Sequence, residues 1–546
     1  MESPQQRPRR TSPTLHLLAI VSILGLALLG YVAVIWSGSL HGYEPSKIVA
    51  ARDLSFFIVI IGLFFWLIRK QKFRGEMIPL TAAVLLFAVG LIMQFRLFSD
   101  PEYGARVERS EFRRAKGQAV RLLNVETGYD DQKKALLFGS PDAVPKNPPA
   151  LEKLPDREYT VGDILTSVNT YIPLMALLAM AGGFLLFKSD RMLLWLQRHA
   201  LIIGVATLLP FSIIAFLSES GKFLGQTTPW EGVKIFFLLS FAGLLADTYQ
   251  HLRRTRWGLP PARYLLPFLL IATMPIVPFF ALSDFGQMLV FFGVYFMLYI
   301  VAVRKRAQLV YALLIVVALF GVFSAISAAK DGFGIPARVH FRFYQWTNTW
   351  EPPAPETWWW NKDYNNYLEA KKLPPPTDPK ELDQRNREAW NDKVLQQSQG
   401  LFGINEGGAL GEGLGLGFPE IVPISDSDFI YAAWSEETGL AGALIVLIAL
   451  AGLVYAGAAI SLAAPDMYTK LLAAGFTAFI GFQAVVNIGG VLRVLPMTGI
   501  TLPFVSHGGW SLITSFAMLG ILLAFSHRNS VTRPVVEKAP EFVPVR

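Results

Sequence analysis

The chain has 546 residues, of which 53% are hydrophobic and 16% charged, a formal net charge of +8 and no cysteine. So large an apolar fraction, gathered in repeated blocks, excludes an ordinary water-soluble globular protein. The lack of cysteine excludes disulfides, thiol catalysis and cysteine metal sites.

Twelve blocks are apolar enough, over about 20 residues, to be candidate membrane-spanning helices. The second is short and carries Arg52 and Asp53 at one end, while the seventh and eighth are nearly fused. The sequence therefore predicts an all-α polytopic membrane protein with about 12 transmembrane helices. The approximate cores are Leu17–Trp36, Leu54–Ile68, Met77–Met93, Tyr171–Phe187, Ala200–Leu217, Trp230–Ala246, Tyr264–Leu282, Phe285–Val303, Leu309–Ala329, Leu440–Leu462, Leu471–Ile488 and Leu512–Phe525.

Lysine and arginine gather in every second loop between these blocks, which is the pattern of cytoplasmic loops. Both termini are therefore predicted to be cytoplasmic, and the net charge needs no nucleic acid as a partner. The first block is long and no small-residue cleavage site follows it, so it is predicted to be a membrane helix rather than a signal peptide.

This topology divides the chain into membrane segments, exposed loops and tails. Cytoplasmic tails are predicted at 1–13 and 528–546, and transmembrane helices at 14–97, 168–329 and 428–527. Two long extracytoplasmic loops are predicted at 98–167 and 330–427.

The first half of the second long loop, Lys330 to Trp390, contains six of the thirteen tryptophans. Tryptophan outside a span favours the headgroup level, so one interpretation places this half on the outer leaflet. The other interpretation is a docking surface for the extracellular domain of a partner, because aromatic residues anchor interfaces. The two interpretations are compatible.

The second half of that loop is rich in glycine and leads to Asp428. Exposed amides of residues such as Gly408, Gly413 and Gly415 can form a nest for an anion such as a diphosphate. The alternative is a tight re-entrant turn buried in protein, and glycine spacing alone does not distinguish the two.

Asp428 stands where the tenth candidate span opens, and a carboxylate there has two uses. It can cap the helix, or, partly buried, it can have a raised pKa and act as a general base. Ser435 follows about two helical turns later and can share its face. Glu436 and Glu437 lie deeper in the span, where charges are costly and usually functional or paired.

The last outward loop, Arg493 to Ser511, combines two prolines, three glycines and several hydroxyls. Irregular backbone at membrane depth is tolerated only where protein covers it or where it lines a wet cavity. His507 in this loop can titrate near neutrality, although a lone histidine is more often structural.

Two polar groups stand near the ends of other spans. Glu231 and Lys234 are three residues apart and can pair along one helix. Asp284, with Gly286 and Gln287, lies between the seventh and eighth spans. Each group can be explained without a functional role, as an internal ion pair or as a helix cap.

Together these motifs resemble the SEDS family (shape, elongation, division and sporulation proteins), which includes FtsW, RodA and SpoVE. The segment from Gln396 to Gly442 is similar to the family's large extracellular loop, with its glycine run and its DFIFA…EE block. The resemblance extends roughly from Trp230 to Phe525. The other matching groups are Leu495–Gly499, Leu502–Phe504 and Ser506–Gly509 in the signature LPxTGxxLPFxSxGG, Pro229–Glu231–Lys234 in a PSExxK helix, and Asp284–Gly286 in a PDLG turn.

The chain also departs from the family's pattern. The family usually has about ten spans, so about two of the predicted spans, before Pro229, are additional, and the tryptophan-rich half loop looks like an insertion. Phe418–Pro419–Glu420 stands where a lysine usually follows Gly-Leu-Gly. His507 stands where a tyrosine is usual, and Trp510 where a serine is usual.

The resemblance implies a peptidoglycan glycosyltransferase of the bacterial inner membrane, active in cell division or elongation. Such a protein polymerises lipid II, the undecaprenyl-diphosphate-linked disaccharide pentapeptide, beside a class B penicillin-binding protein. The resemblance also implies that Asp428 is the catalytic residue and lies on the extracytoplasmic side. Membrane lipids are expected to surround the protein. Substrate-binding candidates are Gly408, Gly413, Gly415, Glu231, Lys234, Arg338, Arg342, Glu436, Arg493, Pro496, Thr498, Ser506, His507, Gly508 and Gly509.

The leaving diphosphate needs positive charge. The candidates are Lys234, Arg338, Arg342 and Arg493, or a divalent cation such as Mg²⁺ or Mn²⁺, and no metal site built from protein residues is predicted. Two other functions stay open from the residues alone. One is a flippase for the lipid-linked precursor, and the other is a non-enzymatic scaffold of the division or elongation machinery.

Overall fold

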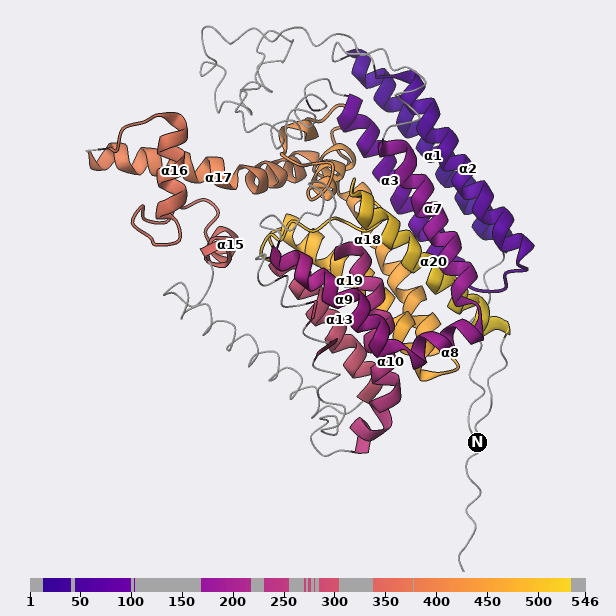
Figure 1. The fold of residues 1–546 in the computed structure, drawn as a ribbon. Coiled ribbons are helices and arrows are strands. Elements are labelled where there is room, and N and C mark those ends of the chain that lie inside the picture. The colour runs from indigo at the N-terminus through magenta and orange to yellow at the C-terminus, as the bar shows by residue number, and fades with distance from the viewer. Residues whose placement is uncertain are drawn as a thin grey trace, which may run out of the picture.

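The computed structural model describes residues 13–40, 45–99, 103, 168–217, 230–254, 270–271, 274–275, 279, 284–303, 337–376 and 378–531. Every regular element in these ranges is a helix. The helices form one elongated bundle, from which a smaller group of helices projects sideways (Figure 1). The predicted all-helical membrane architecture is therefore confirmed for the described part of the chain.

The first three helices are α1 (Pro13–Leu40), α2 (Lys47–Lys70) and α3 (Ile78–Ser99). α1 and α2 run side by side along the edge of the bundle (Figure 1), and many of their leucines and isoleucines point away from the protein. α3 is mostly buried because it packs between α1 and α18 (Ile430–Leu462). An apolar surface of this kind on α1 and α2 is what lipid contact requires.

The middle of the bundle contains α7 (Val168–Phe187), α8 (Asp190–Arg198), α9 (Ala200–Leu217), α10 (Trp230–Arg254) and α13 (Phe285–Val303). α7 packs along α20 (Gly509–Val531), and α8 turns away from α7 by 90°. α9 packs on α10, and α13 packs on α19 (Met467–Val491).

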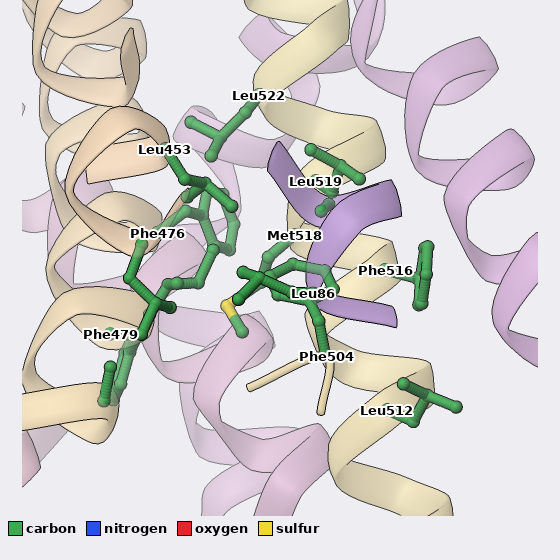
Figure 2. Packing of buried hydrophobic residues seen from close by; sticks show 14 of the residues in the cluster. Leu86, Leu453, Phe476, Phe479, Phe504, Leu512, Phe516, Met518, Leu519 and Leu522 are labelled. Carbon is green, nitrogen blue, oxygen red and sulfur yellow. The ribbon is translucent and has the colours of Figure 1, made fainter. Parts of the chain in front are cut away.

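The C-terminal helices α18, α19 and α20 supply much of the hydrophobic core. Figure 2 shows residues of α3, α18, α19 and α20 meeting there, together with Phe504 of the last loop. The ring of Phe504 packs edge to face on Phe516, with 5.3 Å between the centroids. The last loop is thus anchored in the core rather than lying over its surface.

Seven described helices are long and apolar enough to cross a membrane, or eight if the bent pair α7 and α8 counts as one span. α9 and α13 contain shorter apolar stretches. The predicted spans Tyr264–Leu282 and Leu309–Ala329 lie largely or wholly outside the described residues. The count of twelve therefore stays a prediction, and so does the loop at 98–167.

The tryptophan-rich half loop folds into helices, α15 (Ala337–Thr347), α16 (Asn361–Lys371) and the start of α17 (Pro379–Gly407). They enclose a small core of their own, in which Trp359, Trp360 and Trp390 are at most 9% exposed. The Trp360 indole donates to the side chain of Asn386 (2.8 Å), and Trp390 donates to the carbonyl of Thr349 (2.8 Å). Half of the six tryptophans are thus interior residues, unlike the surface role expected for the group.

Candidate functional site

The polar segments singled out in the sequence gather at one end of the bundle. α10, α13, α18 and α20 begin at this end, and α3 and α19 finish there. The residues before α18 and the loop between α19 and α20 meet at this end, and Asp428 lies at their junction.

Asp428 does not cap α18. The helix begins at Ile430, and its N-cap residue is Phe429, which makes no side-chain capping hydrogen bond. The carboxylate Oδ1 instead accepts a long hydrogen bond of 3.4 Å from the Ser427 hydroxyl. Because the cap interpretation does not hold, the half-buried carboxylate is available for another use.

The last loop wraps around the backbone of Asp428. The Asn487 side-chain amide of α19 donates to the carbonyls of Asp428 (2.9 Å) and Ile500 (2.6 Å). The Ser506 hydroxyl donates to the carbonyl of Ser427 (2.6 Å). Gly499 has a φ of +71°, and a Cβ there would stand 3.4 Å from Oδ2 of Asp428. The backbone of the last loop therefore lies directly against the carboxylate.

The backbone around this junction includes two costly conformations. Ile424 and Phe504 have φ values of +58° and +66°, although neither is glycine. Such residues cost about 1–3 kcal/mol each and persist only where the surroundings hold them in place. They lie in the two segments that meet at Asp428, which is a common location for functional strain.

A second carboxylate, Asp426, is held firmly beside Asp428. Tyr103 donates to its Oδ1 (2.6 Å), and the backbone amide of His507 donates to its carbonyl (2.8 Å). The ring Nδ1 of His507 lies 3.3 Å from Oδ2 of Asp426, and the ring packs edge to face on Phe98 of α3. His507 thus contacts Asp426, and through it the neighbourhood of Asp428.

The surroundings raise the pKa of Asp428 to about 6. Burial makes the largest contribution, and the negative charge of Asp426 adds to it. The hydrogen bond from Ser427 and the positive charge of Arg342 act in the opposite direction. A carboxyl group with such a pKa is ionised at neutral pH and is more basic than an ordinary aspartate, as a general base requires.

Behind the last loop lies a buried polar network. Lys234 donates to Glu231 and to Gln483, each over 2.8 Å. Gln483 in turn donates to the carbonyl of Thr501 (3.0 Å) and to the Ser511 hydroxyl (3.2 Å). Glu231 and Lys234 are therefore engaged with each other and with the support of the last loop.

Asp284 lies at the start of α13 and accepts from the backbone amide of Gln287 (3.2 Å). Burial raises the pKa of Asp284 to about 6. Asp284 is close enough to Asp428 for its charge to raise the pKa of that residue as well. A Cβ at Gly286 would meet Thr498, so the start of α13 packs closely on the last loop.

The glycine loop packs around a break in α18. Gly439 has φ +65° and ψ −165°, which interrupts the helix and frees the carbonyls of Glu436 and Glu437. The amides of Glu412 and Gly413 donate to these carbonyls (3.0 and 2.9 Å). The carbonyl of Gly408 accepts from the amide of Leu440 (2.9 Å). The loop is therefore a tight turn packed on α18, with the Gly413 amide bonded within the protein and with Gly408 and Leu410 exposed.

The carboxylates of the same region are bound internally too. Glu437 accepts from Gly415 N (3.0 Å) and from Arg96 Nε (2.9 Å), and Glu436 accepts from Phe418 N (2.6 Å). Arg96 also pairs with Glu420 (3.2 Å). Arg96, which lies in α3, thus supplies a positive charge between Glu420 and Glu437.

Arg493 does not face Asp428. Its Nε and Nη2 donate to the carbonyls of Trp346 (2.7 Å) and Thr347 (3.0 Å) at the end of α15. Arg342, on the same helix, is half-buried and acts electrostatically on both Asp428 and Asp284. Arg338 lies one turn earlier in α15, but its side chain is outside the described residues.

The structure therefore brings Asp428, Ser506, His507 and Arg342 together, with Pro496, Thr498, Gly508 and Gly509 in or beside the enclosing loop. Four supporting residues were missed in the sequence. Gln483 and Asn487 share a face of α19, and Arg96 is a charge within α3, so polar residues inside apolar spans were the available signal. Asp426 carried no such signal.

Among the described residues, no group of three or more His, Asp or Glu could hold a metal ion.

These features define a polytopic helical membrane protein with a half-buried, non-capping carboxylate at one end of its bundle. Residues 381–531 match the family model FTSW_RODA_SPOVE, described as "Cell cycle protein". Through this segment the chain is similar to the FtsW/RodA/SpoVE family of membrane proteins.

The similar curated proteins match over part of their length. Peptidoglycan glycosyltransferase RodA of Mycobacterium bovis is 41% identical over 139 residues, which is 25% of this chain and 30% of the relative. Stage V sporulation protein E of Bacillus subtilis is 39% identical over 142 residues, 25% of this chain and 39% of the relative. The match thus spans less than half of the length of either relative.

One solved structure with detectable likeness is the rod shape determining protein RodA of Thermus thermophilus. It is 20% identical, with a TM-score of 0.30 over 66% of this chain and 97% of that one. Another comes from work titled "Structural coordination of polymerization and crosslinking by a peptidoglycan synthase complex", at 22% identity and a TM-score of 0.39. Scores this low do not establish a common arrangement of the helices.

Proposed function

We propose that this protein is a peptidoglycan glycosyltransferase that polymerises lipid II into glycan strands, with Asp428 as the general base. The observation that carries the proposal is the state of Asp428: a half-buried carboxylate that caps no helix and lies against the last loop. The segment that contains it matches proteins named peptidoglycan glycosyltransferase.

In the proposed reaction, Asp428 takes the proton from an acceptor sugar hydroxyl. The oxygen of that hydroxyl attacks the anomeric carbon of the donor sugar, and the bond from this carbon to the diphosphate oxygen breaks. Undecaprenyl diphosphate leaves with the bonding electron pair. A base of pKa about 6 is ionised before the reaction at neutral pH and can still accept a proton as the attack proceeds.

The negative charge on the leaving diphosphate requires a cation near the carboxylate. Arg342 is the favoured candidate, because it is half-buried on α15 and its charge lowers the pKa of Asp428. Lys234 and Arg493 are engaged elsewhere in the protein. A divalent cation, Mg²⁺ or Mn²⁺, carried by the diphosphate itself, is part of the proposal, because the described residues include no preformed cluster of three ligands.

The topology proposed with this activity puts Asp428 on the extracytoplasmic side of a bacterial inner membrane, where lipid II is displayed. Loop charge supports this orientation. The proposed partner is a class B penicillin-binding protein, which would crosslink the new strands.

The test is reconstitution of the purified protein in liposomes with its cognate penicillin-binding protein and lipid II. Wild type should form glycan polymer, and Asp428→Asn should form none while still binding the partner. Asp383→Asn is the matched control, because Asp383 is an exposed residue of α17 paired only with exposed Arg387 among its described contacts.

Three outcomes would contradict the proposal. Equal polymer from the Asp428→Asn variant would remove Asp428 from the reaction. Movement of labelled lipid II across the bilayer without polymer would favour a flippase. Partner binding with neither activity, in wild type as in the variant, would favour a scaffold.

A further inference from the structure

Two faces of helix α15 have different surroundings. Ala337, Phe341 and Tyr344, spaced four and three residues apart, pack on the tryptophan core. Arg342 is rotated by about 100° from Phe341 and is close enough to Asp428 for its charge to act there. The helix thus joins the tryptophan core to the candidate site.

The end of α15 is fastened to the membrane bundle through Arg493. Its guanidinium donates to the carbonyls of Trp346 and Thr347, over 2.7 and 3.0 Å. The indole of Trp346 donates back to the carbonyl of Arg493 over 3.0 Å. The last carbonyls of a helix lack partners within the helix and carry its negative dipole end, so a cation there is favourable.

Arg493 is placed for this contact by the chain around it. It follows Leu492, the C-cap residue of α19, and its φ of +58° turns the backbone sharply out of the helix. Its amide donates to the carbonyl of Gly490 (3.2 Å), which fixes that turn. The clamp therefore starts from a rigid spanning helix.

We infer that Arg493 is a positioning residue. By clamping the end of α15 it fixes the position of the helix that carries Arg342, and the tryptophan core supports the same helix from another face. Arg342 lies four residues before Trp346, about one helical turn away from the clamp. The ligand that this arrangement fits is the diphosphate of the leaving group. The inference rests on the proposed function, because Arg342 is given its role by that reaction.

A loosened clamp should therefore affect the reaction without removing the base. Displacement of a positioned group by about 1 Å can cost on the order of 10²-fold in rate. For Arg493→Gln we expect kcat to fall by about 10- to 100-fold with little change in KM. The acid limb of the pH profile should move to higher pH, because Arg342 lowers the pKa of Asp428.

The experiment uses the full-length protein in lipid nanodiscs and compares four variants, together with Arg342→Gln and a double variant described below, with wild type. Arg493→Gln removes both donors to α15, and Trp346→Phe removes only the return hydrogen bond. Arg493→Lys keeps the charge and should restore part of the effect. Arg387→Gln, which breaks an exposed ion pair on α17, is the control and should leave activity unchanged.

Two readouts are measured on each variant. Hydrogen exchange of residues 337–349 reports the clamp without reference to activity, and it should accelerate in Arg493→Gln while residues 440–460 of α18 stay unchanged. Polymerisation of lipid II against pH reports the effect on the site. The double variant Arg342→Gln with Arg493→Gln should lose little more than Arg342→Gln alone, because both act through one group.

The outcomes separate the two proposals. Unchanged exchange of α15 would overturn the clamp whatever the activity shows. Faster exchange with an unchanged rate and pH profile would overturn the positioning role. Additive losses in the double variant would place Arg493 in a different role. A wild type that makes no polymer, with α15 still loosened by Arg493→Gln, would instead refute the proposed function and leave only a structural clamp.

Discussion

The side-chain amide of Asn487 donates to the main-chain carbonyl of Asp428 over 2.9 Å, and its second hydrogen reaches the carbonyl of Ile500 over 2.6 Å. One residue of a spanning helix thereby joins the segment before α18 to the last loop. The Asp428 carboxylate is fixed through its backbone and stays available for other contacts through its side chain.

Replacing Asn487 by alanine should weaken both the fold and the site. The buried carbonyl of Ile500 and the partly buried carbonyl of Asp428 would lose their donor, at a cost of about 1–3 kcal/mol for the buried one. We expect a lower temperature of thermal unfolding in detergent and a large loss of polymerisation. Asn365→Ala, an exposed change on α16, should alter neither. Normal unfolding and activity in Asn487→Ala would show that the tie is dispensable.

Asp428→Asn should abolish polymerisation, by about 10²- to 10⁴-fold or more, without destabilising the protein. Burial raises the pKa of Asp428 in the folded protein to about 6, above the usual value of roughly 3.9. The contribution of this pKa difference to the free energy of unfolding is therefore fully present only below a pH of about 3.9. It is lost as the pH rises through 6. At pH 7 to 8 the neutral amide should therefore unfold at the same temperature as wild type or higher. A marked loss of stability in thermal unfolding at pH 7.5 would contradict this account.

Asp426→Asn should change the pH dependence of the reaction. The charge of Asp426 raises the pKa of Asp428, so its removal should lower that pKa. The acid limb of the rate profile should then move to lower pH, opposite to the shift expected for Arg342→Gln. Shifts of the two variants in the same direction would refute this electrostatic description.

Arg96→Gln should strongly destabilise the bundle. The change would leave Glu437 and Glu420 buried at the end of α3 without their shared cation. Breaking a buried pair from one side costs about 3–5 kcal/mol. Adding Glu437→Gln to Arg96→Gln should recover part of this loss, because one uncompensated charge disappears. Thermal unfolding of the single and double variants measures the effect, and no recovery would argue against charge as the cause.

Gly439→Ala should disrupt the break in α18, and the same helix supplies its control. The conformation at Gly439 is accessible essentially to glycine alone, and a Cβ there would come within 2.7 Å of the backbone of Ala409 and Leu410. We expect a loss of about 2 kcal/mol or more. A Cβ at Gly452 meets nothing within 4 Å, so Gly452→Ala should be neutral or slightly stabilising. Equal thermal unfolding of the two variants would count against the strained break.

Much of the architecture follows from the sequence alone. Apolar blocks of about 20 residues predict α1, α2, α3, α10, α18, α19 and α20, because a spanning helix satisfies its backbone within itself. Asp428 could also be singled out, since a carboxylate at the edge of an apolar helix is conspicuous without knowledge of its neighbours. The use of Asp428 could not be decided, because a cap and a base differ only in the contacts that the side chain makes.

Those contacts depend on residues far apart in the chain. The sequence offered Gly413, Gly415 and Arg493 to a diphosphate, but the tertiary structure gives them other partners, among them Glu437 and the end of α15. It also brings Arg96 to Glu437 across 341 positions, and Asn487 to Asp428 across 59. Local composition and spacing determine which segments enter the membrane, whereas the partner of each polar group is determined only when the packed helices bring distant residues within hydrogen-bonding distance.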